Sequence, residues 1–91
     1  MSDPDPDSAP LGPRRRRLLF RATHRGTHEN DLMAGGFVRV HLAEFDPAEL
    51  DALETLLDLP DTELADWLTG RIPLPTDASP MLVRMRAWVK R

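Results

Sequence analysis

The sequence predicts an all-α protein, folded as one small, compact five-helix bundle in which neighbouring helices are antiparallel. Apolar residues recur with the period of a helix along most of the chain. Helix caps and glycine or proline stops separate the periodic segments. Strand signals are weak, because β-branched residues are few and period-two alternation is absent. At 91 residues the chain has room for one domain only.

Residues 1–13 are expected to form a disordered, acidic and proline-rich tail. The segment is rich in Asp, Pro, Ser and Gly, so it has little apolar surface to bury against a core. The folded domain is therefore placed in residues 14–91.

The first two helices are predicted on either side of a glycine. The first spans residues 14–25 and ends at Gly26. The second begins near Thr27, a suitable N-cap, and has Glu29 and Asp31 in its first turn. Acids are stabilising there because the helix dipole places partial positive charge at the N-terminus.

The second helix has an apolar stripe and two internal glycines. Met33, Phe37 and Val40 follow the i, i+4, i+7 spacing of an inward face. Gly35 and Gly36 should each cost about 1 kcal/mol against Ala inside a helix. A cost of that size indicates either a close helix contact or a local break.

The third helix has the clearest start. Asp46 is predicted as its N-cap, Pro47 occupies the first helical position, and Glu49 can close a capping box. The inward stripe that follows consists of Leu50, Leu53, Leu56 and Leu57.

Two shorter helices complete the bundle. Asp61 is predicted to cap the fourth, and Gly70 to follow its last turn. Asp77 or Ser79 caps the fifth. The inward positions are Leu64, Trp67 and Leu68 in the fourth helix and Leu82, Met85 and Val89 in the fifth.

The net charge of −3 conceals a segregation of charge along the chain. Residues 14–28 contain six Arg and no acid, and residues 78–91 contain three Arg, one Lys and no acid. Between them, residues 29–77 contain twelve acids and two Arg. This pattern favours attraction between segments and a polar docking face.

Composition excludes several classes of site and location. With no Cys there is no disulfide framework, no thiolate zinc site and no cysteine nucleophile. No apolar stretch approaches the roughly 18 residues that a membrane span needs. The first residues lack the apolar core of a secretory signal. We therefore expect a cytoplasmic protein without membrane insertion.

The segment Arg25-Gly26-Thr27-His28-Glu29 is the most informative in the chain. It places a cation and a carboxylate on either side of a glycine between two helices, so both side chains can project from one corner. By its spacing alone the segment is also compatible with a plain helix end that carries an exposed ion pair.

Two landmarks together resemble the SdhE family, the FAD assembly factors of succinate dehydrogenase. The first is an R-G-x-x-E motif followed by an acidic and apolar segment, a glycine and an aromatic residue. The second is a Leu-Leu pair followed by Pro-Asp, Leu and Trp-Leu. The matching residues are Arg25, Gly26, Glu29, Asp31, Leu32, Gly35 or Gly36, and Phe37, then Leu56, Leu57, Pro60, Asp61, Leu64, Trp67 and Leu68. The resemblance covers residues 14–90.

The resemblance implies an assembly factor that is not itself an enzyme. It implies docking on the flavoprotein subunit of succinate dehydrogenase, and in some organisms of fumarate reductase. There the factor assists the autocatalytic attachment of FAD to a histidine. FAD then belongs to the partner, and no tightly bound cofactor is expected in this chain.

Carried over by position, the resemblance makes Arg25, Gly26 and Glu29 the docking and activity residues, with Asp31 and His28 beside them. Gly26 would let backbone approach backbone. Arg25 would offer its planar donor fork to the partner. Glu29 would contact the flavoprotein near its flavin site, and a role as proton acceptor is a less favoured alternative.

The sequence also suggests alternatives to this function. A helical nucleic-acid-binding protein is the main alternative, because residues 14–17 are four consecutive arginines. The acidic middle segment and the lack of aromatics among them, apart from Phe20, argue against it. His24 and His28 are four residues apart, as in some metal sites, yet no further ligand accompanies them. A hydrolase would need a nucleophile elbow, metal motif or phosphate loop, and the sequence shows none.

Overall fold

The computed structural model describes residues 12–91, so residues 1–11 of the expected tail lie outside the described part. Within that part all regular structure is helical, which confirms the all-α fold class. The elements are α1 (Pro13–Thr23), α2 (His28–His41), the 3-10 turn η1 (Leu42–Glu44), α3 (Pro47–Leu57), α4 (Asp61–Thr69) and α5 (Pro80–Val89). The first helix therefore includes Pro13, which was expected in the tail. No helix among these is both long and apolar enough to cross a membrane.

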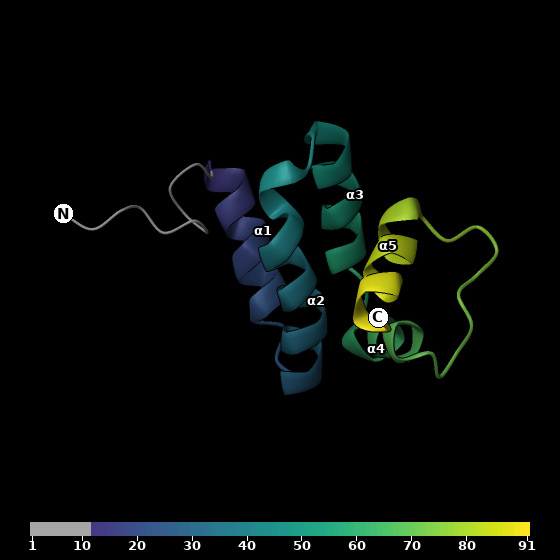
Figure 1. Ribbon diagram of the computed structural model, residues 1–91. Helices are drawn as coiled ribbons and strands as arrows, with labels where there is room; N and C mark the ends of the chain where they lie inside the picture. Colours follow the sequence, from purple (N-terminus) through teal and green to yellow (C-terminus); the bar gives the residue numbers. More distant parts are fainter. Residues whose placement is uncertain (1–11) are drawn as a thin grey trace.

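The helix α2 lies at the centre of the bundle (Figure 1). It runs antiparallel to α1 and contacts α1, α4 and α5. The helix α3 returns alongside in the direction of α1 and contacts both α1 and α5. The short α4 crosses one end of the bundle, and residues 70–79 form a long connection to α5. The corner between α1 and α2 lies at the end of the bundle where α4 crosses.

Within residues 12–91, sixteen apolar side chains form the core, and each of the five helices described there contributes to it. They are Leu18, Ala22, Ala34, Phe37, Val38, Leu42, Phe45, Leu50, Leu53, Leu56, Leu57, Leu64, Leu68, Met81, Leu82 and Met85. Phe37 lies among three aromatic neighbours, with ring centroids 6.1 Å from those of Phe45 and Trp88 and 4.7 Å from that of His41. The predicted stripes of α3, α4 and α5 are largely confirmed; Trp67 and Val89 pack against the core only in part.

The apolar stripe predicted for α2 is wrong at Val40, which is 58% exposed. The buried positions of α2 are Asn30, Ala34, Gly35, Phe37 and Val38. Residue 40 lies two positions beyond Val38, and two residues turn a helix by about 200° at 3.6 residues per turn. Val40 therefore projects away from the core, and the inward face includes a polar residue, Asn30.

Most of the predicted helix caps are confirmed, with corrections at two aspartates. Thr27 accepts a hydrogen bond from the Asn30 amide at 3.3 Å, and Asp46 and Glu49 form the complete capping box. Gly70 ends α4 with φ of 82°, in the left-handed region. The fourth helix has Pro60 at its N-cap, and Asp61 is its first helical residue. Ser79 caps the fifth helix, so the Asp77 alternative is wrong.

Gly35 and Gly36 allow α2 to touch a helix on each of two sides. A Cβ on Gly35 would lie 2.9 Å from Thr23 Cγ2 and 3.2 Å from the carbonyl oxygen of Ala22, both in α1. A Cβ on Gly36 would lie 2.8 Å from the Trp88 ring of α5. The helix is continuous through both glycines. Close helix contact is therefore the reason for the doubled glycine.

Candidate functional site

The corner between α1 and α2 is a tight turn at the surface of the bundle. α1 ends at Thr23 and α2 begins at His28. Between them Gly26 adopts φ of 102°, a conformation that residues with a Cβ rarely take. A Cβ built on Gly26 meets no atom within 4 Å. The glycine is therefore required by backbone conformation, and its outer side is open to an approaching molecule.

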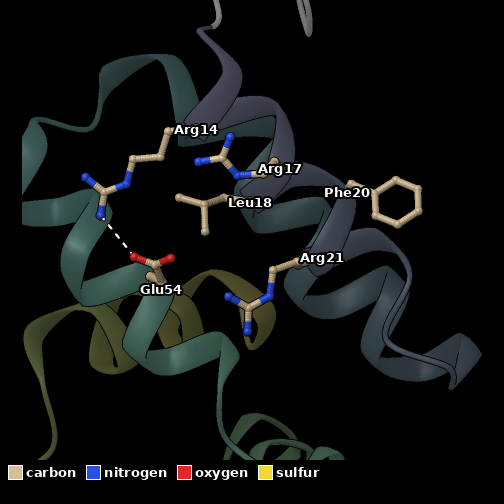
Figure 2. A pocket seen from close by; sticks show the side chains of 6 residues that line it. All are labelled: Arg14, Arg17, Leu18, Phe20, Arg21 and Glu54. Atoms are coloured by element: carbon tan, nitrogen blue, oxygen red, sulfur yellow. Dashed lines mark hydrogen bonds and ion pairs between the residues drawn. The ribbon is translucent and has the colours of Figure 1, made fainter.

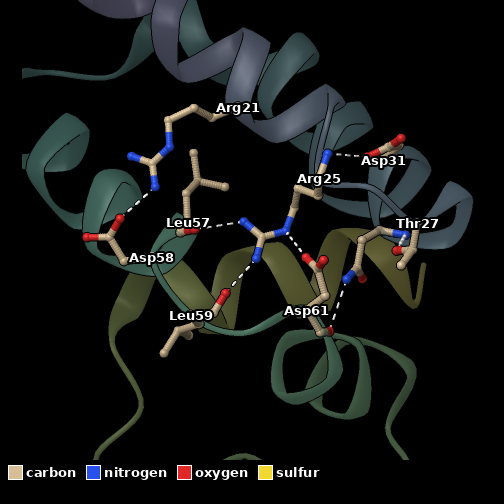
Figure 3. Close-up of polar contacts among 9 residues, drawn as sticks. Arg21, Arg25, Thr27, Asp31, Leu57, Asp58, Leu59 and Asp61 are labelled. Atoms are coloured by element: carbon tan, nitrogen blue, oxygen red, sulfur yellow. Dashed lines mark hydrogen bonds and ion pairs between the residues drawn. The ribbon is translucent and has the colours of Figure 1, made fainter.

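The side chain of Arg25 turns inward from this corner (Figure 3). Its Nε donates to the Asp61 carboxylate at 2.7 Å. Its two terminal nitrogens donate to the carbonyl oxygens of Leu57 at 2.8 Å and Leu59 at 2.6 Å. The side chain is only 7% exposed. One guanidinium thus joins the α1–α2 corner to the last turn of α3 and the first residue of α4.

This placement corrects the expectation that the Arg25 fork faces a partner. All three of its nitrogens already donate to acceptors within the chain. Two of these acceptors are the backbone carbonyls of Leu57, the last residue of α3, and of Leu59, just beyond it. Carbonyls at the C-terminal end of a helix have no hydrogen-bond donor within the helix and need one from elsewhere. The planar fork satisfies both together with Asp61, so the arginine acts on the position of the corner.

Asp61 was predicted to cap α4, but its side chain makes a different contact. It makes no capping hydrogen bond to α4 and instead forms an ion pair with Arg25. Its backbone carbonyl accepts a hydrogen bond from Asn30 Nδ2 at 3.0 Å. The start of α4 is therefore held to the α1–α2 corner through both its side chain and its backbone.

Asp31 also serves the corner from within. Its carboxylate accepts a hydrogen bond from the backbone amide of Arg25 at 2.7 Å (Figure 3). The bond closes the corner across the two helices, because Arg25 precedes the turn and Asp31 lies in the first turn of α2. Asp31 is half-buried at the corner, and its carboxylate faces the chain's own backbone.

Asn30 is a site residue that sequence reasoning missed. It is 1% exposed and lies on the inward face of α2. A buried polar side chain normally finds a hydrogen-bond partner, and Asn30 Nδ2 bonds the Asp61 carbonyl. The available signal was its position four and seven residues before Ala34 and Phe37, which places it on their face.

Glu29 and His28 are the predicted site residues that face outward. Both are exposed at the start of α2. Within residues 12–91 neither side chain forms a hydrogen bond or an ion pair. The corner therefore presents a carboxylate, an imidazole and the bare backbone at Gly26 to solvent, held from beneath by Arg25, Asn30 and Asp31.

The histidines do not form a metal site in the part of the chain that the structure describes. His24 is exposed, and its ring stacks on Phe20 with centroids 4.0 Å apart. No group of three or more His, Cys, Asp or Glu side chains in residues 12–91 is arranged to hold a metal ion. Chemically, the outward face offers an exposed carboxylate and an exposed imidazole that can form hydrogen bonds with another molecule.

Comparison with known proteins connects this arrangement to one family. Residues 16–89 match a family described as flavinator of succinate dehydrogenase. The chain is 54% identical over 76 residues to the FAD assembly factor SdhE of Acetobacter pasteurianus, which covers 82% of this chain and 70% of that protein. It is 41% identical over 59 residues to the mitochondrial succinate dehydrogenase assembly factor 2 of Mycosarcoma maydis, covering 65% of this chain and 25% of that protein. The protein of that name in Scheffersomyces stipitis is 40% identical over 65 residues, covering 68% and 44%.

The chain thus spans a quarter and less than half of these two fungal relatives. No solved structure shows a significant match to it.

Proposed function

Because the chain belongs to the family of succinate dehydrogenase flavinators and assembly factors, we propose that it docks on the flavoprotein subunit of that enzyme and promotes covalent attachment of FAD to a histidine there. The observation that carries this proposal is the exposed Glu29 beside the bare backbone of Gly26, on a corner fixed from inside. A surface that is rigid before binding loses little entropy when a partner docks on it.

The residues of the motif divide the work between outside and inside. Glu29 contacts the partner, and Gly26 allows the partner's backbone to approach the corner closely. Arg25 and Asp31 keep the corner in one conformation through four hydrogen bonds to groups within the chain. The motif is thus partly a docking surface and partly the brace that holds it. His28 lies next to Glu29 and contributes at the edge of the contact.

The chemistry of the attachment explains why docking is enough. A methyl group of the flavin must lose a proton, the histidine must lie in line with it, and the charge that develops on the ring must be stabilised. Holding reacting groups in the correct geometry can supply several kcal/mol of a barrier, and fixed charges near the ring stabilise the developing charge. We propose that this chain supplies position, while flavin and reacting histidine belong to the partner.

Flavin attachment can be measured directly with Glu29 variants. The purified flavoprotein subunit is incubated with FAD and the factor, and covalent flavin is read as fluorescence of the denatured band. We expect Glu29→Ala to lower the rate about tenfold, which corresponds to losing roughly 1.4 kcal/mol of interaction with the partner. Glu29→Gln separates the carboxylate's charge from its shape, and we expect an intermediate loss.

Glu63 provides the matched control for this experiment. It is also an exposed glutamate in the first turn of a helix, α4, and it has no hydrogen bond or ion pair within residues 12–91. Glu63→Ala should therefore have the same small effect on helix stability and none on attachment. Full activity of a folded Glu29→Ala protein would remove the basis for the proposed site.

The client can be identified with the same variants. Wild-type protein and Glu29→Ala are used as bait for the flavoproteins of the cell, and captured proteins are identified by mass spectrometry. We expect the flavoprotein of succinate dehydrogenase to be captured by the wild type and depleted with the variant. Capture of fumarate reductase's flavoprotein alone would assign a different client to the same surface.

A further inference from the structure

The arginine run at the start of α1 is divided among different tasks. Arg14 pairs with Asp51 and Glu54 of α3 at 2.5 and 3.2 Å. Arg15 donates to the backbone carbonyls of Leu42 and Phe45. The side chains of Arg16 and Arg17 are exposed and form neither a hydrogen bond nor an ion pair within residues 12–91. Half of the run therefore holds the bundle together, and half remains available.

Arg17 lies where a row of ion pairs between α1 and α3 is interrupted. The row begins with Arg14 and ends with Arg21, which pairs with Asp58 at 2.6 Å. The three arginines have the i, i+3, i+7 spacing of one helix face. The acids on α3, Asp51, Glu54 and Asp58, have the same spacing. Glu54 is directed to Arg14, so the middle arginine has no carboxylate opposite it.

A hollow occupies the place of the missing pair (Figure 2). Its volume is about 420 Å³, and it is lined by Arg14, Arg17, Leu18, Phe20, Arg21 and Glu54. Figure 2 shows the Arg17 guanidinium beside this space, whereas the Phe20 ring points outward from α1. Phe20 is 62% exposed, an unusual position for a phenylalanine in a small domain. Cationic and apolar surface therefore lie side by side.

The hollow continues toward the α1–α2 corner. A second hollow of about 280 Å³ is lined by Phe20, Arg21, His24, Arg25 and Asp61, so the two share Phe20 and Arg21. The His24 ring, stacked on Phe20, extends the aromatic surface in the same direction. The second hollow therefore extends the first along α1 as far as Arg25, at the corner where α2 begins.

We propose that this face of α1 is a second contact surface for the partner protein, where Arg17 receives a carboxylate from an acidic segment whose apolar side chain packs on Phe20. The inference rests on the proposed function, because it names a second part of the surface that docks on the flavoprotein. The partner's carboxylate completes the interrupted row of ion pairs, and the partner's apolar group covers the exposed ring.

Charge distribution favours a protein segment over a nucleic acid. Glu54 lines the hollow and its side chain is 50% exposed, and the side chains of Asp51 and Asp58, in the pairs at either end of the row, are 73% and 68% exposed. A nucleic acid carries a negative phosphate at every nucleotide, so these acids would repel it along its length. A protein segment can place one carboxylate at Arg17 and neutral groups elsewhere. Local charge therefore selects a partner with sparse negative charge.

Arg16 supplies a control that differs only in direction. It precedes Arg17 on the same helix, and its side chain is also exposed and forms no ion pair within residues 12–91. Unlike Arg17, it does not line the hollow. Arg16→Glu and Arg17→Glu change the net charge identically. Neither variant breaks an ion pair within the described chain, so circular dichroism should show the same helix content for both and for the wild type.

Binding is measured by titration of the purified flavoprotein subunit of succinate dehydrogenase into each full-length factor. We expect Arg17→Glu to weaken the Kd about tenfold or more at low salt and Arg16→Glu by less than about threefold. The difference should shrink toward 1 M salt, where charges are screened over about 3 Å. Phe20→Ala should weaken binding at all salt concentrations, while Val83→Ala, at an exposed apolar residue of α5, should not.

The outcomes separate this inference from the function on which it rests. If the wild type does not bind the flavoprotein, the proposed function fails and the second surface with it. If Glu29→Ala weakens binding while Arg17→Glu behaves like Arg16→Glu, the corner docks and the second surface is wrong. A gel shift with duplex RNA provides the remaining arm: RNA binding lost in Arg17→Glu, with flavoprotein binding unchanged, would assign this face to nucleic acid.

Discussion

The guanidinium of Arg25 and the carboxylate of Asp61 lie 2.7 Å apart and join segments 36 residues apart in the chain. One end of this pair precedes the α1–α2 corner, and the other begins α4. The exposed Glu29 lies on the same corner, four residues after the arginine. The pair therefore connects the outward carboxylate of the motif with the second landmark of the sequence, in which Asp61 follows Pro60.

Replacing Arg25 should reduce the stability of the fold, because the side chain bonds to groups within the chain. Arg25→Ala leaves two backbone carbonyls and the Asp61 carboxylate without their donor. We expect a loss of about 2–4 kcal/mol in the free energy of unfolding, measured by urea denaturation, since hydrogen bonds to charged groups contribute about 1.5–3 kcal/mol each and do not add fully. Arg25→Lys should recover only part of it, because an ammonium cannot reach three acceptors in a plane.

Arg16→Ala is the control for Arg25→Ala, and Glu29→Ala gives the opposite pattern. The Arg16 side chain has no hydrogen-bond or ion-pair partner in residues 12–91, so its removal should change stability by less than about 0.5 kcal/mol. Glu29→Ala should also unfold near the wild-type urea concentration yet lose flavin attachment. An Arg25→Ala protein as stable as the wild type would contradict the inward role assigned to the guanidinium.

Asn30 should contribute to the same junction from the other helix. Asn30→Ala removes the hydrogen bond to the Asp61 carbonyl and leaves a small cavity at a position that is 1% exposed. We expect a loss of about 1–3 kcal/mol in the free energy of unfolding, from the lost hydrogen bond together with the cavity. Thermal or urea unfolding followed by circular dichroism gives the value.

A double-mutant cycle tests whether the two residues act together. Asn30 and Arg25 both bind Asp61, one at its carbonyl and one at its carboxylate. Residues that share a partner are typically coupled by about 0.5–3 kcal/mol. We therefore expect the Arg25→Ala, Asn30→Ala protein to lose less stability than the two single losses added. Strict additivity would mean that the corner and the start of α4 are held independently.

The helix ends could be predicted from the sequence because their signals are local. The capping box of Asp46 and Glu49, the cap at Thr27 and the left-handed Gly70 each depend on residues within one or two turns. Val40 could not be placed in the same way. Its spacing from Phe37 fits an inward face, and only contact with the other helices shows that the stripe is centred on Ala34 and Val38.

The direction in which each side chain at the corner points could not be predicted from neighbouring residues alone. Arg25 and Glu29 are both charged and lie on either side of Gly26, so their sequence predicts an equal, outward role. The difference arises from the end of α3, where the carbonyls of Leu57 and Leu59 need donors. That need comes from residues more than 30 positions away. Asn30 was missed for the same reason, since its partner is the backbone of α4.

The free factor should not bind FAD tightly. The sequence contains no phosphate loop, and three of the four arginines that line the two hollows, Arg14, Arg21 and Arg25, are already paired with carboxylates of the chain. Equilibrium dialysis of the factor against FAD, without the flavoprotein, should show no stoichiometric retention. Retained FAD, released by Arg17→Glu and unaffected by Arg16→Glu, would contradict this prediction and identify the α1 face as a cofactor site.

The two adjacent glycines of α2 should differ in their tolerance of a methyl group. Alanine is favoured over glycine inside a helix by about 1 kcal/mol, so each substitution starts with a gain. At Gly35 the new Cβ would lie 3.2 Å from the backbone oxygen of Ala22 as well as 2.9 Å from Thr23 Cγ2. Backbone cannot move without shifting α1. We expect Gly35→Ala to reduce the free energy of unfolding by about 1–3 kcal/mol, as overpacking does.

At Gly36 the obstacle is the tip of the half-buried Trp88 ring, 2.8 Å from the built Cβ. A side chain at the surface can turn aside, at the cost of its edge contact with Phe37. Gly36→Ala should therefore destabilise less than Gly35→Ala in urea unfolding, and tryptophan fluorescence should shift toward the solvent-exposed value. To test the cause, the effect of Gly36→Ala is measured both in the wild-type protein and in the Trp88→Leu variant. If the clash with the ring is responsible, Gly36→Ala costs less, or becomes stabilising, in the leucine background. An equal cost in both backgrounds would assign the glycine a different role.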